Sequence, residues 1–65
     1  MEELVEYIDH KITDYLEKIE RNNEHLRLHP KTRRADRVEE NALLKAKVDT
    51  LREIKLYIKV MEEEE

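Results

Sequence analysis

The sequence contains no cysteine, glycine, serine, tryptophan or phenylalanine, and Pro30 is its only proline. The lack of cysteine excludes the disulfides that stabilise many small secreted domains. The lack of glycine excludes glycine-rich phosphate-binding loops and leaves only Asn or Asp for tight β-turns with positive φ. No apolar run is long enough to span a bilayer. In a chain of 65 residues that is 46% charged, these absences favour one small all-α domain.

Residues 2–28 show the apolar periodicity of an amphipathic helix. Aliphatic residues and one tyrosine recur at alternating steps of three and four residues, which is heptad spacing. The members of this stripe are Val5, Ile8, Ile12, Tyr15, Ile19 and Leu26. We expect a helix over this segment, with the stripe as its core face.

Pro30 predicts a turn near the middle of the chain. Proline lacks a backbone N–H and disfavours helical geometry in the preceding residue, so the first helix should end at or before His29. A turn over 29–34 and a second helix over about 35–62 should follow. Residues 62–65 are acidic at a helix C-terminus, where the dipole disfavours negative charge, and we expect them to fray. The predicted main face of the second helix contains Leu44, Val48, Leu51, Ile54, Ile58 and Met61.

Two helices of similar length with one short connection predict an antiparallel two-helix hairpin that forms a single domain over residues 1–65. If the turn centres near residue 31 or 32, Ile19 faces Leu44 and Tyr15 faces Val48. Apolar residues meet apolar residues in both layers, which supports this register.

A polar layer interrupts the apolar stripe on the turn side. The same register sets Asn22 and Asn23 opposite Glu40 and Asn41. An asparagine in a heptad seam usually fixes the register or the oligomeric state at some cost in stability. A recognition patch for a partner is the alternative interpretation of the two asparagines.

The second helix carries more apolar surface than one seam can bury. Leu56 and Val60 lie roughly 160° from Ile58 around a helix, so they cannot face the same neighbour. Small domains without disulfides or structural metal ions often gain stability by association. We therefore expect a homodimer packed as a four-helix bundle, whereas the alternative is that these residues lie exposed at a fraying end. The predicted oligomer interface comprises Ile54, Leu56, Tyr57, Ile58, Val60 and Met61.

Catalytic and metal-binding chemistry find little support in the sequence. Cysteine and serine nucleophiles are absent, and a hairpin of two helices offers no deep pocket. His25 and His29 are four residues apart, a spacing that can hold zinc, but a zinc site needs three or four ligands. We expect two solvated histidines, no enzyme activity, no catalytic residue, no metal and no cofactor.

The turn is the only basic segment of a chain whose net charge is −4. Residues 29–37 carry four basic residues against Asp36, a net charge of +3. Guanidinium groups bind carboxylates and phosphates well, and they are unfavourable at a helix N-terminus, where folding alone would prefer acidic residues. The basic head that we predict as the partner-binding site comprises Arg27, Lys31, Arg33, Arg34 and Arg37.

These features predict a small helical interaction protein, acting as an adaptor, inhibitor or regulator, that binds a partner protein with an acidic surface. One alternative is a nucleic-acid-binding regulator that uses the basic head, with RNA favoured over DNA because the acidic body repels a duplex. The other alternative is a purely structural assembly element. The first helix carries eight acidic against four basic residues over 1–28, so we expect no binding to anionic membranes. The acidic start favours the cytoplasm over secretion.

In size and helical-hairpin pattern the chain resembles the Rop-type plasmid copy-number regulators, which are dimeric hairpins that bind RNA. It also resembles a family of small hairpin phosphatase regulators marked by a Ser-Gln-x-Leu-Asp run. The nearest stretch here is Lys47-Val48-Asp49-Thr50-Leu51, which lacks the Ser and the Gln. Short helical chains of this kind are also similar to phage accessory proteins. These resemblances cover the architecture and carry over no functional residue.

Overall fold

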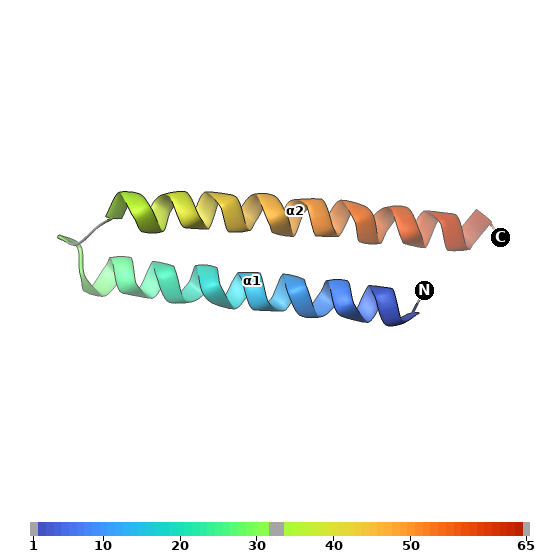
Figure 1. Cartoon of the computed structure of the whole chain (residues 1–65), viewed down its shortest axis with the longest axis horizontal. Coiled ribbons are helices and arrows are strands. Elements are labelled where there is room, and N and C mark those ends of the chain that lie inside the picture. The colour runs from blue at the N-terminus through green and yellow to red at the C-terminus, as the bar shows by residue number, and fades with distance from the viewer. Residues whose placement is uncertain (1, 32–33, 65) are drawn as a thin grey trace.

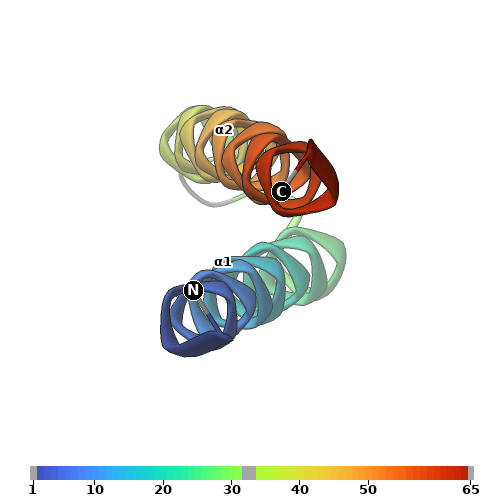
Figure 2. The ribbon, with the colours of Figure 1, turned by 90° about the vertical axis from the view of Figure 1, so that its right-hand side faces the viewer.

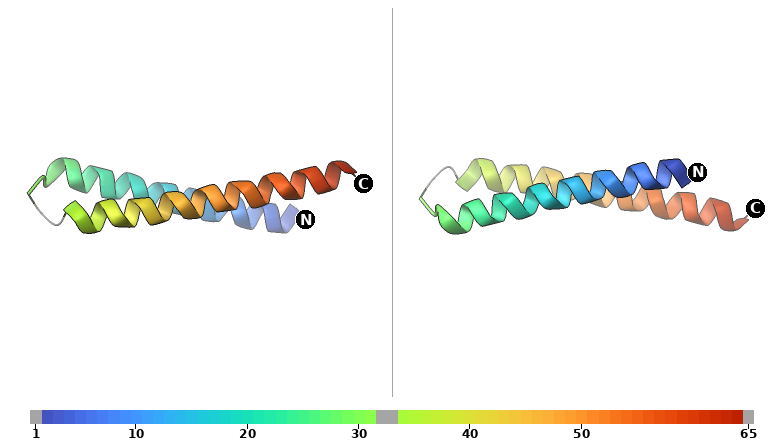
Figure 3. Two further views of the ribbon diagram at one scale, coloured as in Figure 1. Left: turned by 90° about the horizontal axis from the view of Figure 1, so that it is seen from above. Right: turned by 90° about the horizontal axis from the view of Figure 1, so that it is seen from below.

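The computed structural model describes residues 2–31 and 34–64, which form two antiparallel helices (Figure 1). Helix α1 spans Glu2–Leu28 and helix α2 spans Arg34–Glu64. They lie side by side and cross at a shallow angle (Figure 3), giving a rod of 54 × 15 × 12 Å. The predicted helical hairpin is confirmed. Within the described residues, neither helix is long and apolar enough to cross a membrane.

Helix α1 ends where Pro30 requires it to end. Its last residue is Leu28, and the N–H of His29 still donates to the carbonyl of His25 at 2.8 Å. Pro30 and Lys31 then form the described part of the turn. Glu2 and Glu3 occupy the first turn of α1, where the helix dipole favours negative charge.

Helix α2 is longer than the sequence predicts. It begins at Arg34 and stays helical through Glu64, so residues 62–64 continue the helix instead of leaving it. Glutamate is a good helix former and neither glycine nor proline interrupts this end. Each further backbone hydrogen bond there outweighs a dipole penalty of about 0.3–1 kcal/mol. Residue 65 lies outside the described residues.

The hydrophobic core is a single seam between the two helices. Viewed along the rod, α1 and α2 form one pair, so each helix has one covered side (Figure 2). The buried hydrophobic side chains are Ile8, Ile19, Leu44, Val48 and Ile58. Tyr15, Ile12 and Leu51, which the sequence also assigns to the core, are half-buried.

The observed contacts confirm the predicted register. Lys55 donates to Asp9 across the seam at 2.6 Å, far along the rod from the turn. At the turn end, Asn22 contacts both Glu40 and Asn41. Two residues depart from their predicted places on the main face of α2. Ile54 is 44% exposed and Met61 is 43% exposed, because Leu51, Lys55 and Ile58 already fill the side that faces α1.

Candidate functional site

The most complete polar arrangement lies between the helices near the turn. Asn22 is 2% exposed. Its side-chain Nδ2 donates to Glu40 Oε1 and to Asn41 Oδ1, both at 2.9 Å. Its Oδ1 accepts a hydrogen bond from Arg37 Nη1 at 2.7 Å. Asn41 Nδ2 donates to Asn23 Oδ1 at 2.9 Å. We call these five residues the polar cluster.

The polar cluster satisfies Asn22 completely on its donor side and gives its oxygen a charged donor. A buried amide without partners would cost about 1–3 kcal/mol, and hydrogen bonds to charged groups are among the stronger ones. Every partner of Asn22 in the cluster comes from α2. The arrangement therefore favours the register interpretation of Asn22 over the recognition patch.

The structure gives Arg37 a role that the sequence did not indicate. We predicted Arg37 as part of the partner-binding head, but its guanidinium points back to Asn22 and its side chain is half-buried. The signal was present in the heptad pattern, since Arg37 lies one heptad before Leu44 and so falls on the seam side of α2. A charged side chain at such a position is compatible with the seam because Asn22 offers its Oδ1 as an acceptor.

The other described residues of the basic head are exposed, and they differ in what they contact. Arg34 Nη1 donates to the carbonyl of Leu26 at 3.1 Å, which satisfies one of the free carbonyls at the end of α1. Arg27 lies 3.7 Å from Glu24 in an exposed pair that contributes little. Lys31 is exposed, and Arg33 lies outside the described residues. Of the described head residues, Arg27 and Lys31 thus present their charges mainly to solvent.

The two histidines next to the head lie against each other. The ring centroids of His25 and His29 are 4.8 Å apart, with the rings tilted by 39°. Partial burial lowers the pKa of His25 from its ordinary value of 6.5, and the positive charges of Arg37 and His29 lower it further. Among the described residues, no group of three or more His, Cys, Asp or Glu side chains is placed to hold a metal ion.

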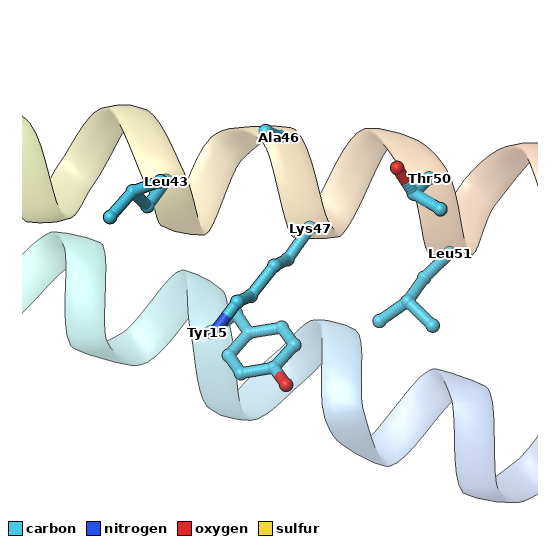
Figure 4. A pocket seen from close by; sticks show the side chains of 6 residues that line it. All are labelled: Tyr15, Leu43, Ala46, Lys47, Thr50 and Leu51. Carbon is cyan, nitrogen blue, oxygen red and sulfur yellow. The ribbon is translucent and has the colours of Figure 1, made fainter.

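A row of alternating lysines and tyrosines crosses the two helices on one side of the rod. Lys11 Nζ lies 5.7 Å from the Tyr7 ring centroid and 6.0 Å from that of Tyr15. Lys47 Nζ reaches over from α2 to within 5.5 Å of the Tyr15 ring centroid (Figure 4). These distances fit cation–π contacts, and the contact of Lys47 with Tyr15 links α2 to α1.

An open groove of about 420 Å³ lies beside Tyr15 and Lys47. Figure 4 shows Leu43, Ala46 and Thr50 spaced along α2, with Tyr15 below them on α1. The groove is open to solvent, so it suits a helix or side chains from another molecule better than an enclosed small ligand. The lining residues are Tyr15, Leu43, Ala46, Lys47, Thr50 and Leu51.

The predicted oligomer interface divides in the structure. Ile58 is only 5% exposed because it packs against α1, so it belongs to the seam within the chain. Leu56 and Tyr57 remain the most exposed, at 63% and 65%. Sequence reasoning missed Leu43, which is 65% exposed on the same helix. The predicted interface residues other than Ile58 are all exposed: Ile54, Leu56, Tyr57, Val60 and Met61.

We predict that Asn22→Ala lowers the free energy of unfolding by about 1–3 kcal/mol, because Glu40, Asn41 and Arg37 each lose a partner at a buried position. The matched control is Asn23→Ala, which loses one hydrogen bond on an exposed side chain and should cost clearly less. Urea denaturation followed by circular dichroism measures both variants at one protein concentration. Equal stabilities for the two variants would contradict a register role for Asn22.

We predict that stability falls as the pH drops below 6.5 and through the lowered pKa of His25. The lowered pKa of His25 means that the folded chain binds fewer protons than the unfolded chain in this window, so protonation favours unfolding. The stabilisation is present above 6.5 and is lost below the lowered pKa. Melting temperatures across this range should change less in His25→Gln than in the control His10→Gln, whose side chain is exposed on α1. An unchanged slope in His25→Gln would contradict the assignment.

Comparison with protein-family models, with curated proteins and with solved structures found no match. No residue role therefore passes to this chain from a relative.

Proposed function

We propose that this chain is a non-enzymatic helical interaction protein that works as a homodimer, packed as a four-helix bundle, and binds a partner protein. The observation that carries the proposal is the imbalance between buried and exposed apolar side chains. Among the described residues, five hydrophobic side chains are buried, whereas eleven large hydrophobic side chains are exposed. Large exposed apolar surfaces on small proteins often mark sites of protein–protein interaction.

Association would supply what the single seam lacks. A domain of this size rarely gains more than about 3–5 kcal/mol from one core, and oligomerisation is a common remedy where disulfides and metals are missing. The exposed apolar residues gather toward the end of α2, where Ile54, Tyr57 and Met61 follow one another at helical spacing. A second hairpin packed there would extend the two-helix seam into a bundle core.

The basic head supports the proposal that the chain binds a partner protein, but with fewer available residues than the sequence predicts. Arg34 and Arg37 are engaged within the chain, so Arg27 and Lys31 are the described residues left to meet an acidic surface. Proteins bind phosphate backbones through many simultaneous charge contacts. With few available basic residues, the head therefore favours a protein partner over a nucleic acid.

The homodimer predicts a sedimentation mass about twice the 8.0 kDa of the chain. Ile54→Glu would place a charge in the proposed interface. We expect this variant to raise the dissociation constant of the dimer at least tenfold. The matched control is Leu16→Glu on α1, where the replaced side chain is similarly exposed, at 42% against 44%. Analytical ultracentrifugation over about 1–100 µM measures both variants, a range that brackets typical weak and moderate affinities. A wild-type monomer throughout this range would contradict the dimer.

If the basic head binds the partner, the double change Arg27→Glu and Lys31→Glu should abolish capture of the partner. The melting temperature should stay close to that of the wild type. Both side chains are exposed, so the fold does not depend on them. Pull-down from native lysate, with and without ribonuclease, measures the capture. The double change Lys45→Glu and Lys59→Glu, at two exposed positions of α2, controls for the change in net charge. Capture that survives the double change would exclude the head, and capture lost on ribonuclease treatment would favour RNA binding.

A further inference from the structure

Helix α2 carries a second heptad stripe that α1 does not cover. Its members are separated by alternating steps of four and three residues, so they share one side of the helix. All six are exposed in the single hairpin. We call the set the outer stripe, and it consists of Leu43, Lys47, Thr50, Ile54, Tyr57 and Met61.

The outer stripe is continuous and long enough to be a helix-packing surface. At about 1.5 Å per residue it runs for about 27 Å along α2. Its turn-side half borders the open groove beside Tyr15, and its other half holds Ile54, Tyr57 and Met61, which are 44%, 65% and 43% exposed. Ala46 lies between Leu43 and Thr50 in the groove lining, and its small side chain permits close approach of another helix.

The pattern of side chains in the outer stripe is self-complementary when two copies run antiparallel. Placing the two-fold axis at the centre of the stripe sets Thr50 opposite Ile54 of the second copy. Lys47 then meets Tyr57, and Leu43 meets Met61. Each pairing occurs twice, as an isologous contact requires. A small side chain meets a larger one at the centre, and two flexible apolar side chains meet at each end.

Charge selects the antiparallel arrangement over the parallel one. Lys47 is the only charged residue of the outer stripe. In a parallel pair it would oppose Lys47 of the second copy, and like charges facing each other are destabilising. In the antiparallel pair it meets a tyrosine ring, a contact that it already makes at 5.5 Å with Tyr15. Lys47 would thus lie between two aromatic rings.

Such a contact would take up a modest share of the surface of the hairpin. A standard interface buries about 800 Å² per partner, which is about one seventh of the 5586 Å² surface of the hairpin. We propose that α2 pairs antiparallel with α2 of a second copy through the outer stripe, with Leu43 next to Met61, Lys47 next to Tyr57 and Thr50 next to Ile54. This inference rests on the homodimer of the proposed function and specifies its interface and orientation.

Disulfide trapping tests the orientation cleanly because the chain has no cysteine. Leu43→Cys and Met61→Cys are prepared separately, mixed in equal amounts, equilibrated and oxidised, and the linked peptides are identified by mass spectrometry. The antiparallel pairing brings Cys pairs within disulfide reach only between the two different variants. We expect the mixed 43–61 disulfide in several-fold excess over the 43–43 and 61–61 products. Leu56→Cys, which is 63% exposed but off the stripe, serves as the control and should link weakly to both.

The remaining outcomes overturn the inference in distinguishable ways. Predominant 43–43 and 61–61 products would establish a parallel pair. Trapping of Leu56→Cys at the same level as the stripe variants would place the interface elsewhere. If ultracentrifugation still shows a dimer in either case, the orientation fails while the homodimer stands. A monomer by ultracentrifugation, with no disulfide above the control level, would remove the homodimer and leave the outer stripe for a helix of another protein.

Discussion

The hydrogen bonds of the buried Asn22 side chain determine which residues of the two helices face each other. Apolar layers built from heptads tolerate a slip of one heptad, because aliphatic side chains then meet other aliphatic side chains. Asn22 does not tolerate it, since a slip would separate its amide from Glu40, Asn41 and Arg37 and leave it buried without partners. The burial of Ile19 and Leu44 in the seam and the contact of Asp9 with Lys55 are therefore compatible with the register that this polar contact near the turn selects.

The narrowness of the seam links the fold to the proposed function. Two helices cover one side of each other, and five hydrophobic residues of the described part of the hairpin are buried along that side. The outer stripe is one side of α2 that stays exposed once the seam is filled. Its exposure is a geometric consequence of having two helices instead of four, and the same side chains that leave the hairpin incomplete give a second copy a place to pack.

Much of the hairpin could be predicted from the order of residues because its determinants are local. Pro30 ends α1 through the missing N–H and its steric effect on His29, and heptad spacing assigns Ile8, Ile19, Leu44 and Val48 to the seam. The opposition of Asn22 to Glu40 and Asn41 also followed from the register. The observed α2 extends to Glu64, two residues beyond its predicted end, because the helix propensity of glutamate outweighs the unfavourable interaction of its charge with the helix dipole. The role of Arg37 was missed because a charged side chain was assumed to face solvent.

The sequence by itself determined the two helices, the turn and the antiparallel register, since these follow from periodicity, a single proline and one polar layer. Only the tertiary structure decided how each side chain is used. The half-buried Arg37 binds Asn22, and the exposed Arg34 binds the Leu26 carbonyl, because the chain reversal brings both acceptors within reach. Ile58 is buried while Tyr57 beside it is exposed, because α1 lies on one side of α2. Contacts between residues distant in the chain depend on where the second helix lies, and periodicity alone does not specify that.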